Sequence, residues 1–149
     1  MPFDDTVFLK RSVDVLSFFT EEQLRRVAAV LDRKTYNTGQ TVVFQGEISH
    51  NFHVIKKGKV MVAAKSGKDK VELAELRAGD FFGEMSLLDS TAATATIRAA
   101  VDDTEILTFS RDIFHTMLKN NPPLEILLRE RILARKKQTA DVFQKDSPQ

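Results

Sequence analysis

The chain has 149 residues, of which 42% are hydrophobic and 29% charged, a size and balance that predict one folded domain and exclude wholesale disorder. Its net charge of +1 provides no overall field to recruit nucleic acid or an acidic membrane, and the absence of cysteine excludes disulfides, thiolate metal sites and cysteine catalysis. No apolar run is long enough to span a bilayer and the acidic start is not a signal peptide, so we expect a cytoplasmic protein.

Two helices are predicted at the start of the chain. Apolar residues of the first segment recur at helical spacing: Phe8, Leu9, Val13, Leu16 and Phe19. Thr20 and Gln23 then form the capping box of a second helix, which we expect from about residue 21 to 32. Its apolar residues share one face: Leu24, Val27, Ala28 and Leu31. Both helices are therefore expected to cover a core.

From Lys34 onward the hydrophobic pattern alternates, as in strands. The predicted strands are residues 34–37, 41–45, 52–56, 59–64, 71–76, 94–101 and 105–110. Most of the connections between them contain a glycine with turn-forming neighbours: Gly39, Gly46, Gly58, Gly67 and Gly79. Short strands that turn on glycine at even spacing favour an antiparallel roll or barrel over a parallel sheet.

The stretch from Gly79 to Ala100 contains the candidate site. Two phenylalanines lead to Gly83, the carboxylate of Glu84 follows, and residues 85–88 predict a short apolar helical turn before a strand that starts at Thr94. Glycine permits close approach of the backbone, and the first N–H groups of a helical turn have no internal partners. The stretch therefore predicts a cup for an anion, with Glu84 accepting a hydrogen bond from a ligand hydroxyl.

These residues resemble the phosphate-binding cassette of the cyclic-nucleotide-binding domain, shared by catabolite activator proteins, regulatory subunits of cyclic-AMP-dependent kinase and cyclic-nucleotide-gated channels. The triplet Phe82-Gly83-Glu84, the apolar residues 85–88 and the strand from Thr94 match the family pattern, and the early glycines match in order. The arginine with which the family clamps phosphate falls on Ala93. No basic residue lies between Arg77 and Arg98 to replace it.

Two further helices are predicted after the roll. Ser110 is a good cap for a helix that ends near residues 120–123, and a final helix is expected from about Leu124 to at least Lys137. By resemblance these are the hinge and lid helices that close over a ligand. We expect one structural domain, divided into N-terminal helices (1–33), a β-roll with the cassette (34–110), hinge and lid helices (111–140) and a fraying polar tail (141–149).

Other chemistries fit the sequence less well. His50 and His53 are three residues apart, which on a strand places them on opposite faces, so a metal site is not expected. Hydrolytic catalysis is not expected either, because the sequence has no Gly-x-Ser-x-Gly nucleophile elbow and Ser86 and Ser90 have no evident histidine partner. The basic final helix is interrupted by acidic residues, has no interleaved aromatics and is not followed by a helix-turn-helix, so it predicts neither a DNA-binding domain nor a membrane contact.

The sequence thus predicts an α+β fold, an antiparallel β-roll of about eight strands with helices at both ends. The expected function is non-enzymatic: a regulatory module that binds cyclic AMP or cyclic GMP, without other cofactors or metals, and signals to a protein effector. The candidate ligand-binding residues are Phe82, Gly83, Glu84, Met85, Ser86, Ala93 and Thr94. Because the loss of the arginine weakens phosphate binding, the alternative is a ligand-free scaffold for interaction, including a homodimer through the C-terminal helices.

Overall fold

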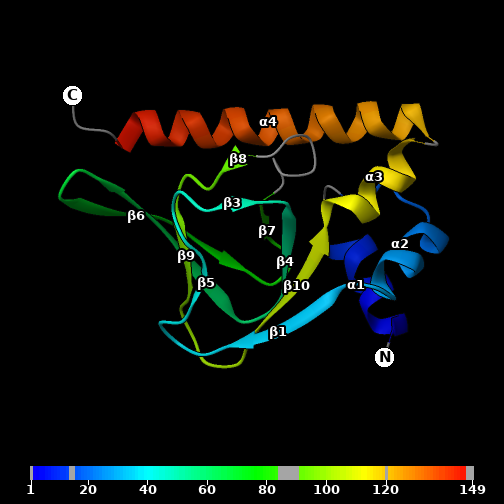
Figure 1. Cartoon of the computed structure of the whole chain (residues 1–149), viewed down its shortest axis with the longest axis horizontal. Helices are drawn as coiled ribbons and strands as arrows, with labels where there is room; N and C mark the ends of the chain where they lie inside the picture. The colour runs from blue at the N-terminus through cyan, green and yellow to red at the C-terminus, as the bar shows by residue number, and fades with distance from the viewer. Residues whose placement is uncertain (1, 14–15, 84–90, 120, 147–149) are drawn as a thin grey trace.

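The body of the molecule consists of two four-stranded antiparallel sheets, shown in Figure 1. The structure is a computed structural model, and it describes residues 2–13, 16–83, 91–119 and 121–146. The first sheet has the strand order β1-β10-β4-β7, with bounds Asp32–Tyr36, Thr104–Ser110, Asn51–Lys57 and Phe81–Phe82. The second has the order β2-β9-β5-β6, with bounds Thr41–Val43, Thr96–Ala99, Lys59–Ser66 and Asp69–Arg77.

A small third sheet pairs β3 (Ile48–Ser49) with β8 (Thr91–Ala92). The predicted α+β roll is confirmed, and each of the seven predicted strands has a counterpart. The sequence did not predict β3, β7 and β8, which have only two residues each. Strands this short are defined by their pairing partners rather than by an alternating pattern of their own.

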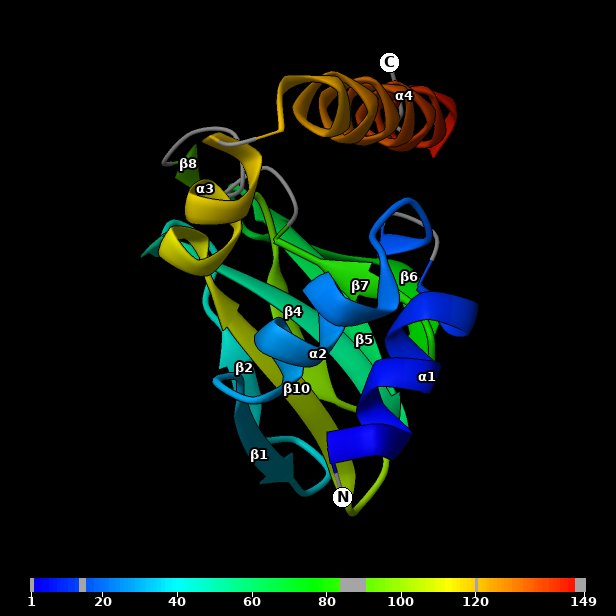
Figure 2. The same cartoon turned by 90° about the vertical axis from the view of Figure 1, so that its right-hand side faces the viewer.

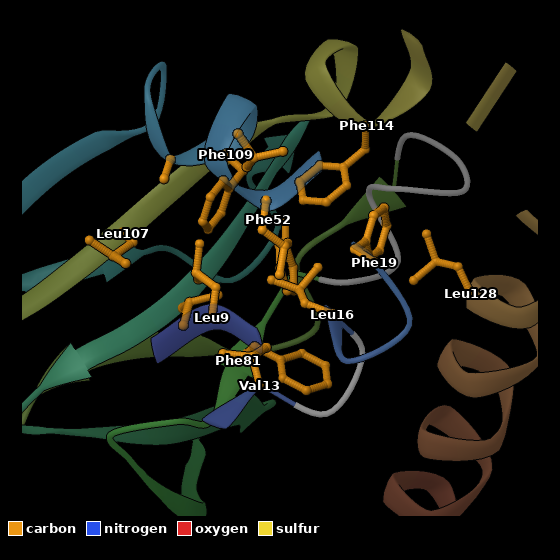
Figure 3. Close-up of a cluster of buried hydrophobic side chains, with 14 of the residues drawn as sticks. Leu9, Val13, Leu16, Phe19, Phe52, Phe81, Leu107, Phe109, Phe114 and Leu128 are labelled. Carbon is orange, nitrogen blue, oxygen red and sulfur yellow. The ribbon is translucent and has the colours of Figure 1, made fainter. Parts of the chain in front are cut away.

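The central strands of the first sheet, β4 and β10, are buried on both faces, and their successive residues point to opposite sides. One face packs against the helices in a phenylalanine-rich cluster, shown in Figure 3. In this cluster the ring of Phe52 lies 5.5 Å from that of Phe81, 5.8 Å from that of Phe109 and 5.9 Å from that of Phe114. The other face points into the roll and packs against the second sheet through Ile55, Phe82 and Ile106.

The N-terminal helices lie against the outer face of the first sheet, as Figure 2 shows. Helix α1 spans Pro2–Ser12, and α2 spans Glu21–Ala28 and begins with the predicted capping box of Thr20 and Gln23. Helix α2 is four residues shorter than predicted. Asp32 belongs to β1 instead, where it lies opposite Thr108, because pairing with β10 outweighs continuation of the helix.

Helix α1 is fastened to the sheet by a buried charge. Only 1% of Asp5 is exposed, and its carboxylate contacts Arg33 of β1 and, at 2.9 Å, the ammonium of Lys56 of β4. The same ammonium lies 4.7 Å from the ring centroid of Phe8. A carboxylate in this position needs its cations, because a buried charge without a partner is costly.

Two helices follow the roll. Helix α3 spans Arg111–Lys119, and the Ser110 hydroxyl accepts a hydrogen bond from the N–H of Asp112, as expected of a cap. Helix α4 spans Pro122–Asp146 and lies along one side of the molecule, at the top of Figures 1 and 2. The helix thus extends beyond Lys137 into the predicted polar tail, and no glycine or proline lies between Pro123 and Asp146 to interrupt it.

Among the described residues, no helix is long and apolar enough to cross a membrane.

The buried ion cluster provides a test of what holds α1. We expect Asp5→Asn to lower the free energy of unfolding by about 2–4 kcal/mol, because the cations of Arg33 and Lys56 lose their buried partner. Urea denaturation measures this change. Glu22→Gln is the matched control: it removes a pair with Arg26 whose side chains are both 74% exposed, so we expect less than about 0.5 kcal/mol. Equal effects of the two substitutions would contradict a structural role for Asp5.

Candidate functional site

The candidate site lies at the inner face of the roll, next to the cassette. The inner face is apolar: Val43, Ile55, Val60, Phe82, Ile97 and Ile106 are buried there. Partly buried residues complete the wall: Tyr36, Val42, Val62, Leu76 and Ala93. Of these, Val62 and Leu76 come from the β5–β6 hairpin and were not singled out from the sequence. Leu76 alternates in the sequence with the charged Glu75 and Arg77, which was a signal for its position, whereas Val62 lies between the apolar Met61 and Ala63 and had no such signal.

The cassette begins where β7 ends. Phe82 is buried in the inner face, and Gly83 follows with a φ of 78° and an exposed backbone. This left-handed conformation is open to glycine at little cost and turns the chain away from the strand. The predicted site residues Glu84, Met85 and Ser86 lie outside the described residues, as does the predicted helical turn of residues 85–88.

Ala93 ends the cassette with its backbone fully engaged. Its N–H donates to the carbonyl of Glu47 at 2.8 Å, and its carbonyl accepts from the N–H of Gly46, also at 2.8 Å. Its methyl group packs against the apolar inner face. Ala93 therefore fixes the loop between β2 and β3 beside the cassette, but it has neither a charged group nor a spare N–H for an anion.

The neighbouring polar residues point in different directions. Thr94 is exposed at the end of the cassette, where its hydroxyl can reach solvent or a ligand. Arg98 lies on β9 opposite Met61 and Thr41, and its Nε donates to the Thr41 hydroxyl at 3.2 Å. Ile97, next to it, faces the inside of the roll, so Arg98 points to the outside.

A buried histidine supports the base of the cassette. His53 of β4 is 7% exposed, its ring stacks on Phe82 with the centroids 4.8 Å apart, and its Nδ1 lies 3.0 Å from the Thr108 hydroxyl. Burial, and secondly the positive charge of Lys34, lower the pKa of His53 to about 4. The imidazole is therefore neutral at physiological pH. The sequence pattern identified His53 only as a rejected metal ligand and gave no sign of this position.

Helix α4 contributes to the helical core rather than to the inner face of the roll. Leu128 and Ile132 are each 1% exposed and belong to the cluster that contains Leu16 and Phe19. The guanidinium of Arg131 lies 5.0 Å from the ring centroid of Phe18. In this arrangement Leu128 and Ile132 pack against other residues of the helical core, so contact between Leu128 and a ligand would require α4 to move.

Comparison with known proteins agrees with this geometry. The model of the family described as the cyclic nucleotide-binding domain matches residues 33–121, which include both sheets and the cassette. The chain belongs to the cyclic nucleotide-binding domain family. The match begins at the second residue of β1 and ends just before α4, so the N-terminal helices and α4 flank it.

Two of the relatives are named for protein kinases. The "cGMP-dependent protein kinase, isozyme 1" of Drosophila melanogaster is 34% identical over 118 residues, which are 77% of this chain and 15% of the kinase. The "cAMP-dependent protein kinase regulatory subunit" of Schizosaccharomyces pombe is 33% identical over 112 residues, 75% of this chain and 26% of the subunit. This chain thus corresponds to a small part of either protein.

A solved structure supports the fold. The sensor domain of the transcriptional regulator DNR from Pseudomonas aeruginosa superposes with a TM-score of 0.80, covering 94% of this chain and 93% of that domain. Its sequence identity is 23%, so the likeness extends to the fold alone.

The position of His53 predicts a pH dependence of stability. The imidazole of His53 has a pKa near the ordinary 6.5 in the unfolded chain and of about 4 in the folded chain. Between these values the unfolded state binds more protons. The contribution of His53 to the free energy of unfolding should therefore be fully present above pH 6.5, and about 3 kcal/mol should be lost as the pH drops toward 4. Urea denaturation across this range, compared with His53→Gln, measures the difference.

The variant keeps a neutral hydrogen-bonding side chain and has no titratable group at this position, so carboxylates affect both proteins alike. Parallel curves of stability against pH for the two proteins would show that His53 is not held neutral by the fold.

Proposed function

We propose that this chain is a non-enzymatic regulatory module that binds a cyclic nucleotide, cyclic AMP or cyclic GMP, with an affinity lowered by the missing cassette arginine. In this proposal the roll of residues 34–110 holds the ligand, and the N-terminal helices (1–33) with the hinge and lid helices (111–140) transmit its binding to a protein effector. A ligand changes the position of the helices only as far as it binds one arrangement more tightly than the other.

The observation that carries the proposal is the junction of Phe82 and Gly83. There the chain leaves the apolar inner face of the roll through a glycine in the left-handed conformation, and Ala93 packs against the same face. The apolar wall formed by residues such as Val62 and Leu76 suits a flat base and sugar. Membership of the family and similarity to a protein named for cyclic AMP support the same ligand class.

Within this site we assign a role to each candidate residue after Phe82. Glu84 accepts hydrogen bonds from the ribose hydroxyl, and the backbone of Gly83, Met85 and Ser86 contacts the phosphate. The hydroxyl of Thr94 donates to a phosphate oxygen. Ala93 provides no charge, so the contacts of the phosphate are made by neutral donors, which bind more weakly than a bidentate arginine.

Restoring the arginine tests this function. We expect Ala93→Arg to raise the affinity for cyclic AMP or cyclic GMP about ten- to a hundredfold, because each hydrogen bond between charged groups contributes about 1.5–3 kcal/mol. Isothermal titration calorimetry with both nucleotides measures the change. Ala92→Arg is the matched control: it adds the same charge one residue earlier, at an exposed position.

A second substitution tests whether the heat of binding arises in the proposed site. Glu84→Gln should abolish the heat of binding in the natural chain and in Ala93→Arg alike. Absence of heat with both nucleotides, in the natural chain and in a folded Ala93→Arg, would contradict the proposal, and so would an equal gain with Ala92→Arg.

One observation favours a second function, an interaction scaffold. Helix α4 leaves Ile126 and Leu133 exposed, at 57% and 48%, on the side opposite the buried Leu128. The two residues are seven apart, so they lie on nearly the same line along the helix. Such a line suits a second copy of α4 packed side by side.

The scaffold predicts self-association that depends on this line. We expect Leu133→Glu to convert a dimer to a monomer in sedimentation velocity, because it places a charge in an apolar contact. Leu127→Glu is the control: Leu127 is also exposed, at 43%, but at six residues from Leu133 it lies about 120° around the helix. A chain that is monomeric before substitution, or equal effects of both variants, would contradict the scaffold.

A further inference from the structure

A groove separate from the cassette lies where the two sheets diverge. Strands β1 and β2 follow each other in the chain, but each is the outermost strand of a different sheet, as Figure 2 shows. The groove between them has a volume of about 530 Å³ and is lined by Lys34, Thr35, Tyr36, Gln40, Thr41 and Phe44. A volume of this size falls in the range of sites for small molecules.

Two aromatic rings supply the apolar part of the groove. Phe44 is 57% exposed, although most large apolar side chains of the roll are buried, and Tyr36 is half-buried against the inner face. An exposed phenylalanine beside a tyrosine leaves apolar area in contact with water. A flat ring placed between these two side chains would cover that area and could stack on either ring.

The groove offers hydrogen-bond donors to a ligand through its polar side chains. The carbonyl oxygen of Gln40 already accepts a hydrogen bond from the N–H of Asn37 at 2.7 Å, so its amide N–H groups are what it can offer a ligand. Among the described side chains no carboxylate forms an ion pair with Lys34, whereas its neighbour Arg33 contacts both Asp5 and Glu105. None of the six lining residues is acidic.

The groove is preformed because the turn between the strands is tied down. The N–H and the hydroxyl of Thr38 both donate to the carboxylate of Asp102, each at 3.0 Å. The N–H of Gly39 donates to the carbonyl of Ala99 at 2.8 Å. A site held open in this way loses little conformational freedom when a ligand binds.

We propose that the groove between β1 and β2 binds small aromatic carboxylates. The carboxylate contacts the ammonium of Lys34 and the amide N–H of Gln40, and the ring lies against Tyr36 and Phe44.

Benzoate is the probe that tests this site, with benzamide as its neutral isostere. We expect benzoate, titrated into the full chain at constant ionic strength, to shift NMR signals of Gln40, Tyr36 and Phe44 saturably, with a Kd on the order of 1 mM because the ligand is small. Benzamide should bind about tenfold more weakly, since it lacks the charge. Phe44→Ala should weaken both.

Two lysine variants distinguish binding in this groove from general attraction of an anion to the basic surface. Lys34→Gln should reduce benzoate affinity about tenfold and leave benzamide unchanged, whereas Lys68→Gln, which removes an exposed lysine of the β5–β6 turn, should change neither. A lysine that only protects a sheet edge from pairing gives no such difference. Equal affinity for both probes, no effect of Lys34→Gln in a folded variant, or saturable shifts confined to Phe82 and Ala93 would overturn the proposal.

Discussion

The burial of β4 and β10, the central strands of the first sheet, on both faces is the constraint on which the rest of the structure depends. Along β4, Phe52 and Val54 face the helices while Ile55 faces the roll, and β10 divides in the same way between Leu107 and Ile106. One sheet thus connects two cores. A change in how the helices pack on the outer core therefore displaces the strands whose other face forms the wall of the candidate site, because the interior is closely packed.

The cassette is placed at the meeting point of these two cores. Phe81 faces the helices and Phe82 faces the roll, so the two residues before Gly83 are each held in a different core. His53 adds a stacked ring and a contact with Thr108. The start of the cassette is therefore rigid, which suits a loop whose backbone must present donors to an anion. In the proposed function, a ligand bound there would act on the helices through adjacent residues rather than over a long path.

The candidate cup and the groove between β1 and β2 differ in how they would treat charge. At the end of the cassette Ala93 is neutral and its backbone hydrogen bonds are taken by the β2–β3 loop. At the groove, Lys34 has no acidic partner among the described side chains, and the lining contains no carboxylate. The inner face thus suits a ligand held mainly by shape and neutral donors, and the groove suits an anion. Tyr36 belongs both to the wall of the inner face and to the lining of the groove, so the two sites are adjacent.

The sequence by itself determined the order of helices and strands, because glycine turns, alternating residues and the capping box of Thr20 and Gln23 are local signals. It also determined the family and the absence of an arginine at position 93. The end of α2, the two-residue strands, the buried position of His53 and the groove beside Lys34 were decided only by the tertiary structure. Each depends on partners far away in the chain, such as β10 for β1 and Phe82 for His53, and no local pattern specifies those partners.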